Sequence, residues 1–162
     1  IAAVQTEYSL WTRDPEIAVL AACQELGAAF VAFSPVARGY LCGLRDLSGL
    51  DAKDIRRGMP RFKPDNYAAN LKLTVAYENI AKEHDCTPAQ LALAWLLHKA
   101  PHIIPIPGTT NPAHMRDNLA AQNLVLTEQT MQKLDAAINA SNVQGPRYDV
   151  QSQSEVDTEF EA

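Results

Sequence analysis

The sequence predicts an α/β fold in which helices cover a parallel β-sheet. Short apolar runs bounded by breaker residues occur at residues 2–5, 30–33 and 103–106, as expected of buried parallel strands. Between and after these runs, apolar residues recur at helical spacing. Strands that alternate with helices in this way are typical of a parallel sheet.

Three parallel strands cannot close a barrel, and an open sheet of three strands leaves two bare edges and one poorly covered face. We therefore expect the chain to form part of a larger sheet. The chain begins with Ile1 rather than methionine, inside an expected strand, which suggests a fragment or a processed piece.

Four of the expected helices carry an apolar stripe that marks a core-facing side. The stripes are Ile17, Leu20 and Ala21; Leu73, Ala76, Tyr77, Ile80 and Ala81; Leu91, Ala94 and Leu97; and Met131, Leu134 and Ile138.

Helix starts are expected at Asp14, Thr87 and Asn111, because each offers a side-chain acceptor at the N-cap and precedes a proline. Thr87 and Gln90 also have the spacing of a capping box. Gly27 is expected to end the first helix.

Two segments lack a clear pattern. Residues 40–66 have few periodic positions, and the acidic, polar segment at 141–162 is expected to be loose. The sequence therefore divides into a body at residues 1–140 and a C-terminal tail at 141–162.

The composition of the 162 residues is 47% apolar and 20% charged, and no apolar run is long enough to suggest a membrane span. A formal net charge of −5 argues against a broad nucleic-acid surface. The basic residues Arg56, Arg57, Arg61 and Lys63 are expected to form a solvated loop face. We therefore expect neither nucleic acid nor membrane as a partner.

The cysteines Cys23, Cys42 and Cys86 have no metal-ligand or paired spacing, so the sequence supports neither a metal site nor a disulfide framework. The start of the chain also lacks the basic and apolar regions of a signal peptide. Together these features favour a cytoplasmic protein.

The junction after the third expected strand has the form of a phosphate site. Gly108 lets the backbone come close to a ligand, Thr109 and Thr110 offer hydroxyl donors, and free N–H groups follow at the start of a helix. His114 and Arg116 add donors or charge nearby. The alternative, at even odds from these residues alone, is an ordinary turn followed by a helix cap.

The junction after the second expected strand offers Phe33 to stack on a flat ring, Ser34 as a hydrogen-bonding group and Arg38 to pair with a phosphate. The alternative makes Phe33 part of the core and Arg38 solvent-facing, and these residues alone favour it.

In the first expected strand, Gln5 and Glu7 lie on one side and Val4, Thr6 and Tyr8 on the other. Gln5 could bind a carboxamide through paired donor and acceptor atoms. Tyr8 and Trp11 are expected to pack rather than to catalyse. We also expect structural roles for His84, His98 and His102.

Taken together, the junctions resemble the aldo-keto reductases. The segments that carry the resemblance are VQTEYSLW, AFSPVARGYLCG, PRFKPDN before a long helix, TPAQLALAWLL, IPIPGTTNPAHMRDNLAA and GPRY. They occur in the family's order from Val4 to Tyr148. The resemblance implies the C-terminal portion, about three β/α units, of a TIM (β/α)8 barrel that is incomplete in this chain.

The resemblance also implies a bound NADP(H) in an extended pose. In that family the matching positions contact the nicotinamide carboxamide (Gln5), stack on the nicotinamide ring (Phe33) and line the pyrophosphate (Ser34, Val36 and Arg38). Others cradle the adenosine 2′-phosphate (Gly108, Thr109 and Thr110) or reach the adenine (Asp117 and Asn118).

The sequence departs from the family pattern in two respects. His114 stands where arginine is usual, with Arg116 two residues later, and we expect Arg116 to substitute. The family's catalytic Asp, Tyr, Lys and His come from earlier strands, so no catalytic residue is assigned in this chain, and Tyr8 is not taken as the catalytic tyrosine.

The resemblance thus implies an NADPH-dependent oxidoreductase that reduces small aldehydes or ketones, of which this chain carries the cofactor-binding half. The alternative is a non-catalytic nucleotide-binding or regulatory module derived from the same barrel. In either case we expect the remaining barrel half or a second copy to complete the sheet.

Overall fold

The computed structural model describes residues 1–156. Its strands β1 (Ala3–Glu7), β2 (Ala29–Phe33) and β3 (Ile103–Pro105) form a parallel sheet in the order β1-β2-β3. The parallel α/β sheet expected from the sequence is therefore confirmed. The first strand extends two residues beyond its expected end, because Glu7 pairs in register with Phe33.

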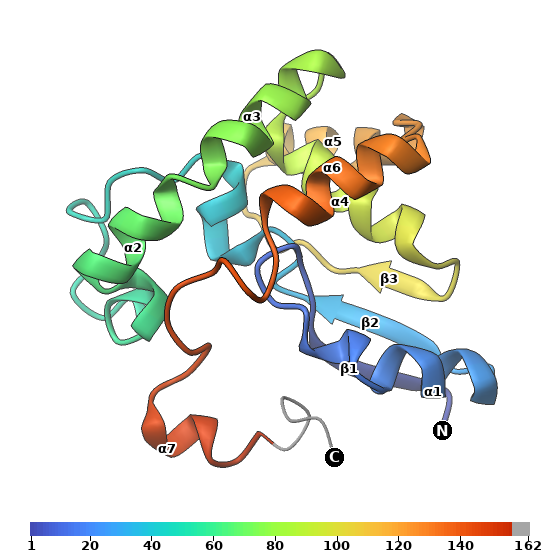
Figure 1. Cartoon of the computed structure of the whole chain (residues 1–162), viewed down its shortest axis with the longest axis horizontal. Coiled ribbons are helices and arrows are strands. Elements are labelled where there is room, and N and C mark those ends of the chain that lie inside the picture. Colours follow the sequence, from blue (N-terminus) through green and yellow to red (C-terminus); the bar gives the residue numbers. More distant parts are fainter. Residues whose placement is uncertain (157–162) are drawn as a thin grey trace.

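Helices join and cover the strands, and α3 to α6 lie together on one side of the sheet (Figure 1). No helix within residues 1–156 is long and apolar enough to cross a membrane. The described helices are α1 (Val19–Leu26), α2 (Pro64–Leu71), α3 (Thr74–Glu83), α4 (Pro88–Lys99), α5 (Pro112–Ala120), α6 (Glu128–Ala137) and α7 (Val150–Gln153).

The core lies between the sheet and the helices, where α4 contacts β3 and α1 contacts β2. Tyr8, Phe30 and Trp95 are fully buried there. The ring of Tyr8 packs edge-on against Phe30, with centroids 5.8 Å apart, and its centroid lies 5.3 Å from that of Trp95. Burial of such large rings is the main apolar contribution to stability on this side of the sheet.

Most of the expected helix caps are present. The hydroxyl of Thr87 accepts from the Gln90 amide N–H at 3.1 Å, and the Gln90 side chain accepts from the Thr87 N–H at 3.0 Å, which completes the capping box. Asn111 Oδ1 accepts from the N–H of Ala113. Gly27 ends α1 in the left-handed conformation, with φ of 65°.

The expected helix start at Asp14 is wrong. Residues Asp14–Glu16 form only a 3-10 turn, and α1 begins at Val19. Asp14 does not cap this turn, whose N-cap residue is Arg13 and makes no side-chain cap hydrogen bond. The segment is held instead by Glu16, whose carboxylate accepts hydrogen bonds from Tyr8 and Arg13.

The first apolar stripe faces the core only in part, since Leu20 is half-buried and packs against the core, whereas Ile17 is 43% exposed and Ala21 is exposed. This helix lies beside β1 at the edge of the sheet. Residues of both elements, with Ile1, line an apolar hollow of about 190 Å³ there. The exposed apolar side chains follow from the bare edge that the sequence predicted.

The long helix expected after PRFKPDN is divided into α2 and α3. At the division, the N–H groups of Lys72 and Leu73 bond to carbonyls three residues earlier, and the hydroxyl of Thr74 donates to the carbonyl of Leu71. These local bonds compete with the α-helical pattern. The two shorter helices can then follow different directions.

Residues 40–66 contain short 3-10 turns, with basic side chains holding the loops between them. Arg57 donates to the carbonyls of Leu50 and Asp51, and Arg56 forms an ion pair with Asp54 at 2.6 Å. Arg57 and Lys63 are exposed, as expected of a solvated loop face, whereas Arg56 and Arg61 are half-buried and donate to the backbone carbonyls of Arg38 and Gly145.

The tail expected to be loose is anchored where it passes α2 (Figure 1). Asn70 is fully buried, and its amide both donates to the carbonyl of Gln144 and accepts from the Gln144 N–H, at 3.0 and 2.7 Å. The contact joins residues 74 positions apart in the chain. Residues 157–162 of the tail lie outside the described part of the chain.

Candidate functional site

The carboxyl ends of the three parallel strands lie at the same end of the sheet, and the loops that follow the strands leave from that end. The register aligns Glu7 with Phe33 and Ala32 with Pro105. The N–H of Ile106 then donates to the carbonyl of Ala32 at 3.0 Å, which continues the contact between β2 and the segment after β3. The expected juxtaposition of the second and third strand ends is confirmed.

Gln5 and Phe33 lie on the same face of the sheet. Side chains alternate along a strand, so Gln5 shares a face with Glu7, and the register puts Val31 and Phe33 beside them on β2. This face points away from the core that contains Phe30 and Tyr8. Gln5 is exposed and Phe33 is half-buried, so an amide and an aromatic ring are both available to a flat ligand.

The loop after β2 has an unusual backbone. Ser34, Ala37 and Arg38 have φ of 49°, 53° and 55°, in the left-handed region that residues other than glycine rarely adopt. Each such residue costs about 1–2 kcal/mol, so this conformation needs support from its surroundings. The Ala37 N–H donates to the Ser34 carbonyl at 2.9 Å, and the Gly39 N–H donates to the carbonyl of Val36 at 3.2 Å.

Glu7 and Arg147 belong to this junction, although the sequence analysis gave neither a role. Glu7 is 4% exposed, and its Oε2 accepts from Arg38 Nη2 at 2.7 Å. Arg147, 6% exposed, reaches the same oxygen from the C-terminal tail, with Nε 3.9 Å away. Two signals pointed to them: Glu7 shares a strand face with Gln5, and Arg147 lies in the GPRY segment.

The loop after β3 is far more open. Gly108, Thr109 and Thr110 are exposed, and a Cβ at Gly108 would meet no atom within 4 Å. Thr109 Oγ1 accepts from the N–H of Asn111 at 3.1 Å, so one of the two expected hydroxyls already serves the start of α5. Asn111 Oδ1 likewise accepts from the N–H of Ala113, and the positive end of the α5 dipole lies at this loop.

The expected adenosine residues on α5 have different surroundings. His114 and Arg116 are exposed. Asp117 accepts a hydrogen bond from the hydroxyl of Thr87 at 2.9 Å, which ties α5 to the start of α4. Asn118, with Thr109, lines a hollow instead.

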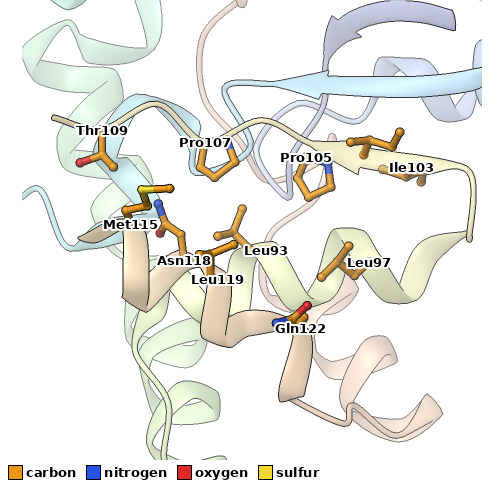
Figure 2. Close-up of a pocket in the computed structure, with 11 residues that line it drawn as sticks. Leu93, Leu97, Ile103, Pro105, Pro107, Thr109, Met115, Asn118, Leu119 and Gln122 are labelled. Atoms are coloured by element: carbon orange, nitrogen blue, oxygen red, sulfur yellow. The ribbon is translucent and has the colours of Figure 1, made fainter. Parts of the chain in front are cut away.

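That hollow measures about 460 Å³ and lies between β3, α4 and α5 (Figure 2). Its walls are mainly apolar, and Met115 and Leu119 are each 58% exposed. Such a lining suits covering protein better than a charged nucleotide. Of the three residues expected around the 2′-phosphate, Thr109 lines this hollow, whereas Gly108 and Thr110 do not.

Tyr8 has no access to this face. It points into the core, where its hydroxyl donates to Glu16 at 2.5 Å. Burial, reinforced by the negative charge of Glu16, raises the pKa of Tyr8 far above its ordinary value. Tyr8 therefore serves packing, as expected. Trp11 packs too, with its ring stacked on Tyr40 at 4.1 Å.

The sequence profile of the Aldo/keto reductase family matches residues 1–139. The chain belongs to this family. A curated relative, "Probable aldo-keto reductase 1" of Glycine max, is 38% identical over 148 residues, which cover 91% of this chain and 43% of the relative. The resemblance found in the sequence is therefore confirmed.

Two solved structures are similar to the chain. The thermostable aldo-keto reductase Tm1743, solved with the inhibitor epalrestat, is 32% identical with a TM-score of 0.61, over 85% of this chain and 40% of Tm1743. The glycerol dehydrogenase AKR11B4 from Gluconobacter oxydans has a TM-score of 0.76 at 23% identity, over 93% of this chain and 46% of that enzyme, and supports the fold alone. The chain thus spans less than half the length of these proteins, and its three β/α units form part of the family barrel.

Proposed function

We propose that the chain is the cofactor-binding portion of an NADPH-dependent reductase of small aldehydes or ketones. The observation that carries the proposal is the shared position of two loops at one sheet edge. The loop at residues 34–38 and the loop at 108–110 follow adjacent parallel strands. Gln5 and Phe33 lie on the face of the sheet that points away from the core. In eight-fold barrels, ligands bind at this end of the strands.

The side chains present fit a nicotinamide dinucleotide phosphate. Gln5 has an exposed amide for the carboxamide, and Phe33 has a half-exposed ring for stacking. Ser34, Val36 and Arg38 would line the diphosphate. Gly108, Thr109 and Thr110 would surround the 2′-phosphate, with Asp117 and Asn118 toward the adenine. The buried Nε of Arg38 has no hydrogen-bond partner within residues 1–156, which leaves one donor of a cation unused.

The cofactor, when bound, supplies a hydride to the carbonyl carbon of the substrate. In this chain, Phe33 would pack against one side of the nicotinamide ring and so determine which side meets the substrate, while Gln5 would fix the rotation of the ring. The proton for the developing alkoxide would come from a tyrosine in another part of the protein. Of the five described tyrosines, Tyr8, Tyr40, Tyr67 and Tyr77 are buried in the core, and Tyr148 is half-buried with its ring against the guanidinium of Arg147.

Arg116 is the proposed cation for the 2′-phosphate, in place of the arginine usual at position 114. A charge-assisted hydrogen bond contributes about 1.5–3 kcal/mol, so Arg116→Ala in the full-length protein should weaken NADPH binding at least about tenfold and leave NADH binding unchanged. His114→Ala is the matched comparison on the same helix and should have the smaller effect. An unchanged NADPH dissociation constant in Arg116→Ala would refute this assignment.

The proposal as a whole is tested by titrating the full-length protein with NADPH and then measuring NADPH oxidation with a panel of aldehydes and ketones. We expect binding and turnover. Binding without turnover of any carbonyl compound would favour the non-catalytic nucleotide-binding module instead, and absence of NADPH binding would exclude both.

A further inference from the structure

The carboxylate of Glu7 joins three separate parts of the chain. Its Oε1 accepts from the hydroxyl of Thr12 at 3.0 Å, in the turn after β1. Its Oε2 accepts from Arg38 in the loop after β2 and lies 3.9 Å from Nε of Arg147 in the tail. A carboxylate is withdrawn from water in this way only where cations and hydrogen bonds compensate it. Glu7 therefore depends on all three segments being in place.

Arg38 is held at both ends. Its guanidinium bonds to Glu7, and its backbone carbonyl accepts from Arg56 Nη1 at 3.0 Å. Beside it lies a hollow of about 210 Å³ that is lined by Arg38, Gly58 and Met59 together with Tyr148 and Asp149 of the tail. Arg38 lines this hollow, and its buried Nε has no hydrogen-bond partner among the described residues, so its guanidinium keeps a donor for an anionic acceptor.

The tail is fixed in turn, and we call residues 144–148 the C-terminal strap. Asn70 pairs with Gln144, and Arg61 Nε donates to the carbonyl of Gly145 at 3.1 Å. Gly145 has φ of 91°, and a Cβ there would lie 2.6 Å from Asn66 Nδ2. Close contact with α2 thus directs the strap so that the next charged residue, Arg147, reaches Glu7.

We propose that Glu7 is a positioning residue of the cofactor site, which orients Arg38 toward the diphosphate of the dinucleotide, and that Arg147 couples the C-terminal strap to this arrangement. The inference rests on the proposed function. A diphosphate is bound best by a guanidinium whose geometry is already fixed, because less side-chain freedom is then lost on binding. Glu7 itself does not touch the ligand.

The test compares Glu7→Gln, Arg38→Ala and the double variant in the full-length protein. Glutamine keeps the size of Glu7 and its bond to Thr12 but removes the charge that holds Arg38. Each single variant should weaken NADPH binding roughly tenfold. The double variant should bind no more weakly than Arg38→Ala, because Glu7 acts through Arg38. Adenosine 2′-monophosphate, which has no diphosphate, should bind to the wild type and to all three variants with equal affinity.

Arg147→Gln should weaken NADPH binding less, by roughly two- to fivefold, because its Nε stands farther from Glu7. The control for Glu7→Gln is Glu83→Gln, which makes the same substitution in an exposed ion pair with Lys133. It should leave the affinities for NADPH and for adenosine 2′-monophosphate unchanged. If Glu7→Gln does not fold, Arg38→Lys replaces it: the charge remains, the two-sided fork is lost, and NADPH binding alone should weaken.

Unchanged NADPH affinity in Glu7→Gln, losses that multiply in the double variant, or an equal loss for adenosine 2′-monophosphate would each overturn the inference while leaving the proposed function intact. A wild-type protein that binds no NADPH would instead remove the proposed function itself.

Discussion

The two faces of the sheet differ in nearly every physical respect. On the helix side, Tyr8, Phe30 and Trp95 are fully buried in close-packed aromatic contacts. On the opposite face, Ile104 and Ile106 are 49% and 43% exposed, and Gln5 and Phe33 of the candidate site lie on this face. One face is fully packed, whereas the other carries apolar side chains that are exposed. Gln5 and Phe33 therefore lie on the face that is still open.

The largest expected effect concerns residues 1–162 as an isolated polypeptide. Domains are stable by only about 5–15 kcal/mol, and an open apolar face with two bare edges offsets that amount. We expect the isolated chain to self-associate or unfold, and the full-length protein to be stable. Size-exclusion chromatography with light scattering distinguishes the two. An isolated monomer with a cooperative thermal transition would contradict the contrast between the faces.

On the fully packed face, Trp95→Ala should lower the free energy of unfolding of the full-length protein by about 3–5 kcal/mol. The substitution removes a fully buried ring, its hydrogen bond to Asp135 and its contacts with the cations of Arg13 and Lys99. Urea denaturation measures the loss. A change below 1 kcal/mol would mean that this side is not the core.

On the open face, Ile104→Ala tests whether the barrel closes over the sheet. In the full-length protein the side chain should be buried, so the loss should be about 2–4 kcal/mol. An exposed isoleucine would cost less than about 0.5 kcal/mol. Urea denaturation therefore discriminates directly between a covered and an uncovered face, and Val125→Ala, a substitution at a 79% exposed position, provides the baseline.

Phe33→Ala should act on the ligand more than on the fold. Loss of ring stacking contributes about 0.5–1.5 kcal/mol beyond the buried area, so the NADPH dissociation constant should rise roughly tenfold. Phe33→Tyr keeps the ring and should restore most of the affinity. Fluorescence titration measures the NADPH dissociation constants of both variants. Equal affinities of the alanine variant and the wild type would show that Phe33 does not stack on the nicotinamide.

The smallest expected effect is a pH dependence at Glu16, on the fully packed side. Burial works to raise the pKa of Glu16, but hydrogen bonds from Arg13 and Tyr8 outweigh it and hold the pKa below 4.5. Its contribution is thus present above pH 4.5 and is lost as the pH falls through the lowered pKa. Glu16→Gln should destabilise by at most about 1 kcal/mol at neutral pH. The melting temperatures of Glu16→Gln and the wild type should converge in acid. A difference that widens in acid would contradict a lowered pKa of Glu16.

Local signals predicted local features well. The capping box at Thr87, the cap at Asn111 and the left-handed Gly27 depend on a few neighbouring residues, and all three are present. Asp14 failed because a tertiary contact decided that segment: the carboxylate of Glu16 binds Tyr8 eight residues earlier. A cap signal carries no information on such competition.

The candidate site divides in the same way. The identity of the loops at residues 34–38 and 108–110 could be predicted from order and spacing, because parallel strands bring their carboxyl ends to one edge. The role of Glu7 could not, since its partners lie 31 and 140 positions away. Similarly, the docking of Gln144 on Asn70 has no local signature, and the tail therefore read as loose.

The two tryptophans make the contrast between regions directly observable. Trp95 lies in the helix-side core between two cations, whereas Trp11 stacks on Tyr40 beneath Arg61, the residue that binds Gly145. Each indole therefore senses a different neighbourhood. With Trp95 replaced by phenylalanine, a change in the Trp11 emission would report whether the C-terminal strap is docked, without any attached dye.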